Sequence, residues 1–270
     1  MKVNPVRVKP KKALGQHFLT DMSVASRIAD TVDVAGYSSL PILEIGPGTG
    51  VLTRFLLQKG REVRCVELDA ESVEYLKINY PGLPVIEADF LKLGLHGLFP
   101  GKFCLTGNYP YNISSQIFFR LLDYKDSIPV CTGMLQREVA ERICAAPGSR
   151  TRGILSVLLQ AWYDCEYLFT VSENVFNPPP KVKSGVLRLT RNSVTGLGCD
   201  EAMFKRVVKT AFGMRRKTLR NSLASMLPPD SELRNDPLLG ERPERLTVAQ
   251  FIHLTRALTP TGGSKPTKQE

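Results

Sequence analysis

The sequence predicts an α/β fold with a mostly parallel sheet, followed by a small helical domain. Residues 41–135 alternate short apolar runs with stretches whose apolar residues recur at helical spacing. Such alternation is typical of strand–helix–strand units with right-handed crossovers. In the last quarter of the chain the pattern changes to helices alone. We therefore expect a larger domain at residues 1–195, which begins with a flexible basic arm at residues 1–12, then a helical domain at residues 196–258 and a disordered tail at residues 259–270.

Each element follows from its own pattern. Five apolar runs are expected to form strands, at residues 41–46, 62–68, 83–89, 102–108 and 130–135. Helical spacing predicts helices at residues 51–60, 70–80, 114–124, 137–144, 201–212, 215–227 and from Thr247 onward, where Thr247 and Gln250 suggest a capping box. Two more apolar runs, 165–172 and 185–191, flank a proline-rich loop, and we expect them to pair antiparallel at the sheet edge.

Composition excludes several classes of protein. No run of 18 apolar residues occurs, which argues against a membrane-spanning helix. The N-terminus is basic but lacks the apolar segment of a secretory signal. Six scattered cysteines without a C-x-x-C pair, and three dispersed histidines, argue against a metal site and a disulfide framework. These features predict a cytoplasmic protein without a metal.

Positive charge is concentrated in two places. The net charge is +10, and residues 1–12 hold five Lys or Arg without an acid. A second cluster without acids lies in the helical domain and comprises Lys205, Arg206, Lys209, Arg215, Arg216, Lys217 and Arg220. Uncompensated clusters favour a polyanionic partner, so we expect the second cluster to bind nucleic acid, although solvated helix faces are the simpler alternative.

A glycine-rich loop follows the first expected strand. LEIGPGTG places Gly46, Gly48 and Gly50 between a strand and a helix, where backbone can approach a ligand closely. The spacing differs from the G-x-G-x-x-G of dinucleotide folds, Pro47 removes one amide, and Glu44 precedes the loop. A carboxylate there favours a cationic ligand over a pyrophosphate, and S-adenosylmethionine fits because it has a sulfonium and no phosphate. A glycine turn of purely structural use is the alternative.

Two acids follow the next two expected strands. Glu67 lies about 20 residues after Gly46, at the place where an acid commonly holds a ribose diol. Asp89 follows the third strand, beside Phe90, and can accept from an adenine amino group. Each acid alone also fits a surface turn or a helix cap. Together with the glycine loop, at the edge where open sheets bind ligands, they predict an S-adenosylmethionine site.

The sequence GNYPYN ends the fourth expected strand at the same edge. An adenine amino nitrogen is a poor nucleophile because its lone pair is delocalised into the ring, so two acceptors must grip its N–H groups and aim it at a methyl donor. Asn108 offers a side-chain carbonyl, and Pro110 fixes a turn that presents the carbonyl of Tyr109. Tyr111 can stack on the base. The alternative is a structural proline turn whose aromatic residues pack inward.

The proline-rich sequence VFNPPPKVKSG presents Phe176 and Lys181. Phe176 is a candidate to sandwich a base against Tyr111. Because bases inside a helix are out of reach, the target would be flipped or already unpaired, as in RNA loops. An edge connection with an ordinary buried phenylalanine is the alternative.

Taken in order, these motifs resemble the KsgA family of small-subunit ribosomal RNA adenine N6,N6-dimethyltransferases. The resemblance covers about Lys11 to Leu258 and adds KKALGQHFLTD, MLQREVAERI, RGILSVLLQ and AFGMRRKTLRNSL to the motifs above. It implies a seven-stranded Rossmann-like class I S-adenosylmethionine-dependent methyltransferase domain and a small helical RNA-binding domain. It also implies dimethylation of two adjacent adenosines in the 3′-terminal hairpin loop of 16S rRNA and a role in 30S subunit biogenesis. The implied partner is the 30S subunit or its precursor, and the protein is expected to be a monomer.

The resemblance also implies site residues. It gives contacts to S-adenosylmethionine from His17, Leu19, Gly46, Glu67, Asp89 and Asn108. Around the target base it gives Asn108, Tyr109, Pro110, Tyr111 and Phe176. The family often has Asn at the position of His17 and usually Leu at the position of Tyr109. Because only the carbonyl of Tyr109 is needed, we expect activity to survive that difference.

Three other functions are weighed. The sister family that methylates large-subunit rRNA shares the glycine loop and a similar turn, but the KKALGQHFL and AFGMRRKTLRNSL sequences favour the small-subunit enzyme. An enzyme that methylates a protein glutamine amide would have no use for two basic clusters. A non-catalytic assembly factor of the small subunit is disfavoured because Glu67, Asp89 and the Asn108–Tyr111 turn are all intact.

Overall fold

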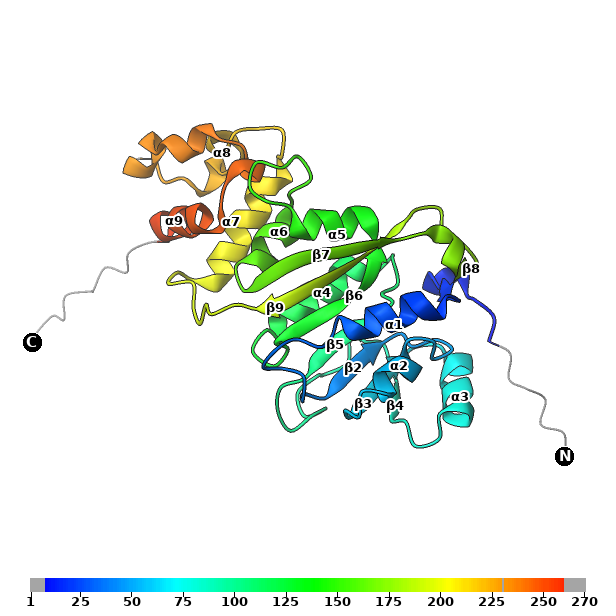
Figure 1. The fold of residues 1–270 in the computed structure, drawn as a ribbon. Coiled ribbons are helices and arrows are strands. Elements are labelled where there is room, and N and C mark those ends of the chain that lie inside the picture. Colours follow the sequence, from blue (N-terminus) through cyan, green and yellow to red (C-terminus); the bar gives the residue numbers. More distant parts are fainter. Residues whose placement is uncertain (1–7, 230, 260–270) are drawn as a thin grey trace, which may run out of the picture. The chain divides into compact units, whose positions relative to one another are not determined.

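The structure, a computed structural model, describes residues 8–229 and 231–259, and these residues form two compact units (Figure 1). The first unit holds the described residues up to Cys144 together with Trp162–Ser193, and the second holds Ala145–Ala161 together with the described residues from Val194 onward. The division therefore differs from the expected 195/196 boundary, because the segment 145–161 packs with the helical unit. Most of the expected basic arm and nearly all of the expected tail fall outside the described residues.

The first unit is built on a seven-stranded mixed sheet, as the sequence predicts. Its strand order is β4-β3-β2-β5-β6-β9-β7, in which β9 runs antiparallel to both of its neighbours and the other pairs are parallel. The strands are β2 (Ile42–Ile45), β3 (Val63–Glu67), β4 (Val85–Glu87), β5 (Cys104–Gly107), β6 (Val130–Gln136), β7 (Tyr163–Val171) and β9 (Ser184–Arg191). The expected antiparallel edge pair is confirmed, with β7 at the edge.

Helices cover this sheet through apolar faces. They are α1 (Met22–Asp30), α2 (Thr53–Leu57), α3 (Ala70–Asn79), α4 (Ser114–Asp123) and α5 (Arg137–Cys144). Asp21 caps α1 by accepting from the amides of Ser23 and Val24, and Ile28 packs into a core that includes Met134 of β6. The central strands β2, β5 and β6 are buried on both faces, which explains why their sequences are continuous apolar runs rather than alternating ones.

A two-stranded sheet was not expected from the sequence. Phe18–Leu19 (β1) pairs antiparallel with Phe176–Asn177 (β8), although the GQHFL sequence resembles a lead-in to the following helix. The pairing joins segments that are more than 150 residues apart. It holds the N-terminal segment beside the carboxyl ends of the parallel strands.

The second unit is helical. It contains α6 (Ile154–Gln160), α7 (Glu201–Gly213), α8 (Leu219–Ser222) and α9 (Val248–Leu258), with short 3-10 turns between α8 and α9. The capping box at Thr247 and Gln250 is confirmed. The helix expected at 215–227 is wrong in length: α8 is one turn long and a 3-10 turn, Ala224–Met226, follows it.

Candidate active site

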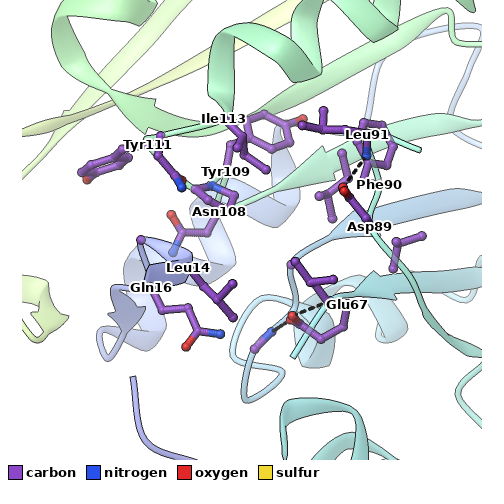
Figure 2. Close-up of a pocket in the computed structure, with 18 of the residues that line it drawn as sticks. Leu14, Gln16, Glu67, Asp89, Phe90, Leu91, Asn108, Tyr109, Tyr111 and Ile113 are labelled. Atoms are coloured by element: carbon purple, nitrogen blue, oxygen red, sulfur yellow. Dashed lines mark hydrogen bonds between the residues drawn. The ribbon is translucent and has the colours of Figure 1, made fainter. Parts of the chain in front are cut away.

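The carboxyl ends of the parallel strands open into a cavity of the first unit (Figure 2). Its wall combines the ends of β2, β3, β4 and β5 with the N-terminal segment 13–18. The lining of the cavity includes Leu14, Gln16, His17, Gly46, Glu67, Asp89, Phe90, Leu91, Asn108, Tyr109, Pro110, Tyr111 and Ile113. Among the described residues that line the cavity there is neither a lysine nor an arginine, whereas two carboxylates are present. The cavity is therefore poorly suited to a pyrophosphate and suited to a ligand with positive charge.

Glu67 ends β3 and anchors the glycine loop. One carboxylate oxygen accepts from the amide of Gly48 at 3.0 Å, and the other accepts from the amides of Leu68 and Asp69 at 2.8 and 2.9 Å. Burial raises the pKa of Glu67, against the effect of these three amides. Gly46 has a φ of +64° and open space where a Cβ would lie, so the loop backbone is accessible at that position.

Asp89 and a set of apolar side chains form the other part of this wall. One oxygen of Asp89 accepts from the amide of Leu91 at 2.9 Å, which fixes the carboxylate at the start of the following turn. Phe90, Leu91, Leu14 and Ile113 surround the space beside it (Figure 2). Apolar side chains around a space with one carboxylate at its edge can hold a purine ring and accept from its amino group.

Asn108 lies at the opposite side of the cavity, immediately after β5. Its amide nitrogen donates to the backbone carbonyl of His17 at 3.0 Å. Because the nitrogen is engaged in this way, the side-chain oxygen is left to accept from a ligand. The N-terminal segment therefore orients the amide that the sequence analysis assigns to the target amine.

The ring of Tyr109 lies in the protein interior. The side chain is fully buried, its hydroxyl donates to the carbonyl of Thr132 at 2.7 Å, and its backbone amide donates to the carbonyl of Met134 at 2.8 Å. Burial raises the pKa of this phenol well above its ordinary value, so the phenol stays neutral. These two bonds tie the turn to β6.

Tyr111 and His17 lie against each other at the rim of the cavity. Their ring centroids are 5.6 Å apart with an interplanar angle of 30°. The Tyr111 hydroxyl is 2.6 Å from the hydroxyl of Ser184. The Nδ1 atom of His17 donates to the carbonyl of Pro178 at 2.8 Å, since a carbonyl can only accept. His17 therefore stacks on one face of the Tyr111 ring.

The structure does not bring Leu19 and Phe176 into this cavity. Phe176 belongs to β8, is 4% exposed and packs into the core, and it is not among the residues that line the cavity. Leu19 is 5% exposed and lines a smaller cavity under the glycine loop. The other predicted residues of the target and cofactor sites, including His17, Gly46 and Pro110, all line the larger one.

Glu44 differs from what its position in the sequence suggests. Its side chain is buried beside Cys65, whose thiol donates to it at 3.8 Å, and it borders the smaller cavity. Burial raises its pKa to about 8, so the group is protonated near neutral pH when the cavity is empty. Its contribution to the choice of ligand charge is therefore weaker than the sequence argument assumes.

An ion pair holds the N-terminal segment over the site. Lys11 lies 2.5 Å from Asp69 and 3.1 Å from Glu71, and the side chain of Gln16 donates to Asp69 at 3.3 Å. Burial opposes ionisation of Asp69, but the hydrogen bonds from Lys11, Gln16 and Ser72 outweigh it and lower its pKa. Sequence reasoning missed Leu14 and Gln16 because nothing in their spacing indicates a ligand.

The predicted nucleic-acid contacts belong to the second unit. Arg215, Arg216 and Lys217 are exposed in the turn between α7 and α8, and Arg206 is exposed on α7. Arg220 donates to the carbonyl of Arg234 at 2.7 Å. Lys205 and Lys209 are the other two predicted residues and lie on α7.

The described residues include neither a membrane-spanning helix nor a cluster of metal ligands. No helix in residues 8–229 or 231–259 is long and apolar enough to cross a membrane. The same residues contain no group of three or more His, Cys, Asp or Glu side chains that could hold a metal ion.

The chain is similar to known proteins over nearly all of its length. The family model described as ribosomal RNA adenine dimethylase matches residues 7–257. A protein of Phocaeicola vulgatus named ribosomal RNA small subunit methyltransferase A is 66% identical over 92% of this chain and 89% of its own length. A protein of Porphyromonas gingivalis with the same name is 60% identical over 94% of this chain and 99% of its own length. Another of the same name, from Flavobacterium johnsoniae, is 56% identical over 95% of this chain and 98% of its own length.

Two solved structures are also similar. A dimethyladenosine transferase from Plasmodium falciparum has a TM-score of 0.74 and 25% identity, covering 88% of this chain and 96% of that one. The 23S rRNA methyltransferase ErmE has a TM-score of 0.64 and 27% identity, covering 88% and 99%. The chain therefore shares its fold with these two transferases.

Proposed function

We propose that this chain, which belongs to the ribosomal RNA adenine dimethylase family, dimethylates N6 of two adjacent adenosines in the 3′-terminal hairpin loop of 16S rRNA. The methyl donor is S-adenosylmethionine. The single observation that carries the proposal is the orientation of Asn108, whose amide nitrogen is bound to His17 so that its oxygen can accept from an amine. The expected substrate particle is the 30S subunit or its precursor in the cytoplasm, and the protein is expected to act as a monomer.

The cavity fits S-adenosylmethionine. The apolar slot beside Asp89 suits adenine, Glu67 suits a ribose diol, and the lack of a lining cation among the described residues suits a ligand without phosphate. Gly46 leaves backbone open to the ligand. When bound, this co-substrate supplies an electrophilic methyl group on a sulfonium.

The residues opposite Glu67 and Asp89 would prepare the nucleophile. The side-chain oxygen of Asn108 and the carbonyl of Tyr109 grip the two N–H groups of the adenine amine, which favours a pyramidal nitrogen aimed at the methyl group. Tyr111 holds the base by stacking. No strong base is needed, because the amine proton becomes acidic once the nitrogen is alkylated. The same grip serves a second transfer through its remaining N–H.

The test is transfer of labelled methyl groups to small subunits from cells that lack this protein, followed by mass spectrometry of the rRNA. We expect dimethyladenosine to appear in the 3′-terminal hairpin. Methylation of large-subunit rRNA instead would favour the activity of the sister family. Binding to the particle without any methyl transfer would favour the assembly-factor role.

The variant Asn108→Ala tests the role of Asn108 in methyl transfer. We expect it to lower the rate of transfer by about 10²-fold or more, since it removes an acceptor that acts in the transition state. Binding of the RNA should change little. Equal losses of RNA binding and of transfer would contradict the positioning role of Asn108.

A further inference from the structure

The segment Pro178–Lys183, called here the proline loop, is attached to the rim of the cavity at both ends. At its start, the Pro178 carbonyl accepts from Nδ1 of His17 at 2.8 Å. At its end, the Lys183 carbonyl accepts from the amide of Arg137 at 3.0 Å, and the next residue, Ser184, contacts the hydroxyl of Tyr111 at 2.6 Å. The loop is thus fixed to the two stacked rings beside Asn108.

The proline loop presents positive charge to solvent. Lys181, Val182 and Lys183 are exposed, whereas Pro180 is buried and holds the loop in place. Neither lysine has an acidic partner in the part of the chain that the structure describes, in contrast to Lys11 and Lys59, which have two each. Two side chains without partners, on a segment fixed by three hydrogen bonds, lose little backbone freedom when they bind an anion.

Charge is distributed differently inside and outside the cavity. The lining carries carboxylates and, among the described residues, no lysine or arginine, so a phosphate is disfavoured there. The lysines of the proline loop lie outside this lining. Pro178 of the loop bonds to His17, and Ser184, which follows the loop, contacts Tyr111. Figure 2 shows Tyr111 and Asn108 on one side of the cavity, and Glu67 and Asp89 on the other.

We propose that Lys181 and Lys183 bind backbone phosphates of the RNA next to the adenosine that enters the cavity. This inference rests on the proposed function and adds an RNA-binding surface on the catalytic unit to the basic cluster of the helical unit. The phosphates that flank a base in the cavity would lie at its rim, where lysine side chains can neutralise their charge and fix the position of the strand. Because the loop bonds to His17 and the next residue, Ser184, contacts Tyr111, phosphates held there would place the base beside the Tyr111 ring.

The test compares two double variants. Lys181→Ala/Lys183→Ala removes the two charges of the loop. The control, Lys77→Ala/Lys102→Ala, removes two exposed charges of the same unit. Lys77 is in the last turn of α3 and Lys102 precedes β5, so both lie at the amino ends of the strands, away from the cavity. The RNA probe is the 3′-terminal hairpin of 16S rRNA, titrated at several salt concentrations without methyl donor.

We expect the loop variant to bind the hairpin more weakly and with a lower salt slope, by about 0.7 for each lost contact to an unpaired strand. The control should keep the wild-type slope, and Lys181→Arg/Lys183→Arg should restore it. The Kd for S-adenosylmethionine, measured by calorimetry without RNA, should be unchanged in all variants.

Three results would overturn the inference. They are a loop variant with the wild-type slope, a control with an equal loss, and a loop variant that no longer binds S-adenosylmethionine, which would indicate a structural role. Methyl transfer by the wild-type protein is measured on the same hairpin and on 30S subunits. Failure of both transfers contradicts the proposed function and is separate from the binding result.

Discussion

Tyr109 fills a slot that two glycines leave open. A Cβ on Gly133, whose φ is +152°, would lie 2.7 Å from the Tyr109 ring, and a Cβ on Gly107 would lie 3.2 Å from it. The ring also meets Phe118 of α4 edge-on, with centroids 5.8 Å apart. The residue that differs from the usual Leu is therefore matched by its surroundings, and its phenol fastens the turn that carries Asn108.

We expect Tyr109→Phe to lower the free energy of unfolding by about 1 kcal/mol, because the bond to the Thr132 carbonyl is lost while the ring is kept. Tyr109→Leu should cost more, since it also leaves a cavity. Methyl transfer by the Phe variant should stay close to wild type, because the backbone carbonyl is unchanged. Chemical denaturation and a transfer assay measure both effects. A Phe variant with normal stability but little activity would contradict this assignment.

At the scale of elements, the N-terminal segment is a wall of the cavity that is held by side-chain contacts. Lys11 pairs with Asp69, which is also the N-cap of α3, so the segment and the helix share one anchor. Beyond the anchor, Leu14 and Gln16 line the cavity, and β1 pairs with β8. Ligand binding and the order of this segment are therefore coupled.

We expect Lys11→Ala to weaken binding of S-adenosylmethionine several-fold with only a small effect on unfolding. Gln16 and Ser72 still donate to Asp69 in this variant, so global stability should change little. The weaker binding follows because the wall that includes Gln16 loses its anchor. Calorimetry gives the Kd, and Lys12→Ala, which removes an exposed neighbouring charge, is the control. Equal Kd values for both variants and the wild type would show that the anchor is not needed.

A second prediction at this scale concerns RNA binding by the exposed turn between α7 and α8. Arg215→Ala/Arg216→Ala should weaken binding of the RNA hairpin and lower the salt slope, by up to about 0.9 for each lost contact to a duplex phosphate. Arg150→Ala/Arg242→Ala removes two exposed charges from the same unit and should have a smaller effect. A slope that is unchanged in the first variant would place the RNA-binding face elsewhere.

At the scale of the whole molecule, the buried acid Glu44 links folding to pH. Its pKa is about 8 in the folded protein, because burial disfavours the charged form, against an ordinary value of 4.5. Between these two pH values the folded chain keeps a proton that the unfolded chain releases. The contribution of Glu44 to stability is therefore full below the lower value and falls as pH rises toward the higher one.

We expect the stability of the wild type to fall relative to Glu44→Gln between about pH 5 and pH 8, by up to about 1.4 kcal/mol for each pH unit. Gln is a neutral side chain of the same size, so this variant lacks the titration. Burial also raises the pKa of Glu67, and the comparison with the Gln variant isolates Glu44 from that effect. Denaturation curves at several pH values, without ligand, measure the difference. Parallel curves for the two proteins would contradict a titrating Glu44.

The sequence by itself determined the strand–helix order, the glycine loop, the acids after β3 and β4 and the turn after β5. These features depend on local periodicity and on the rule that parallel strands share one carboxyl edge. Only the tertiary structure decided that the His17 carbonyl orients Asn108, that Phe176 is buried, that Glu44 holds its proton and that residues 145–161 join the helical unit. Each of these depends on burial or on contact between distant segments, and neither of them leaves a periodic signal in the chain.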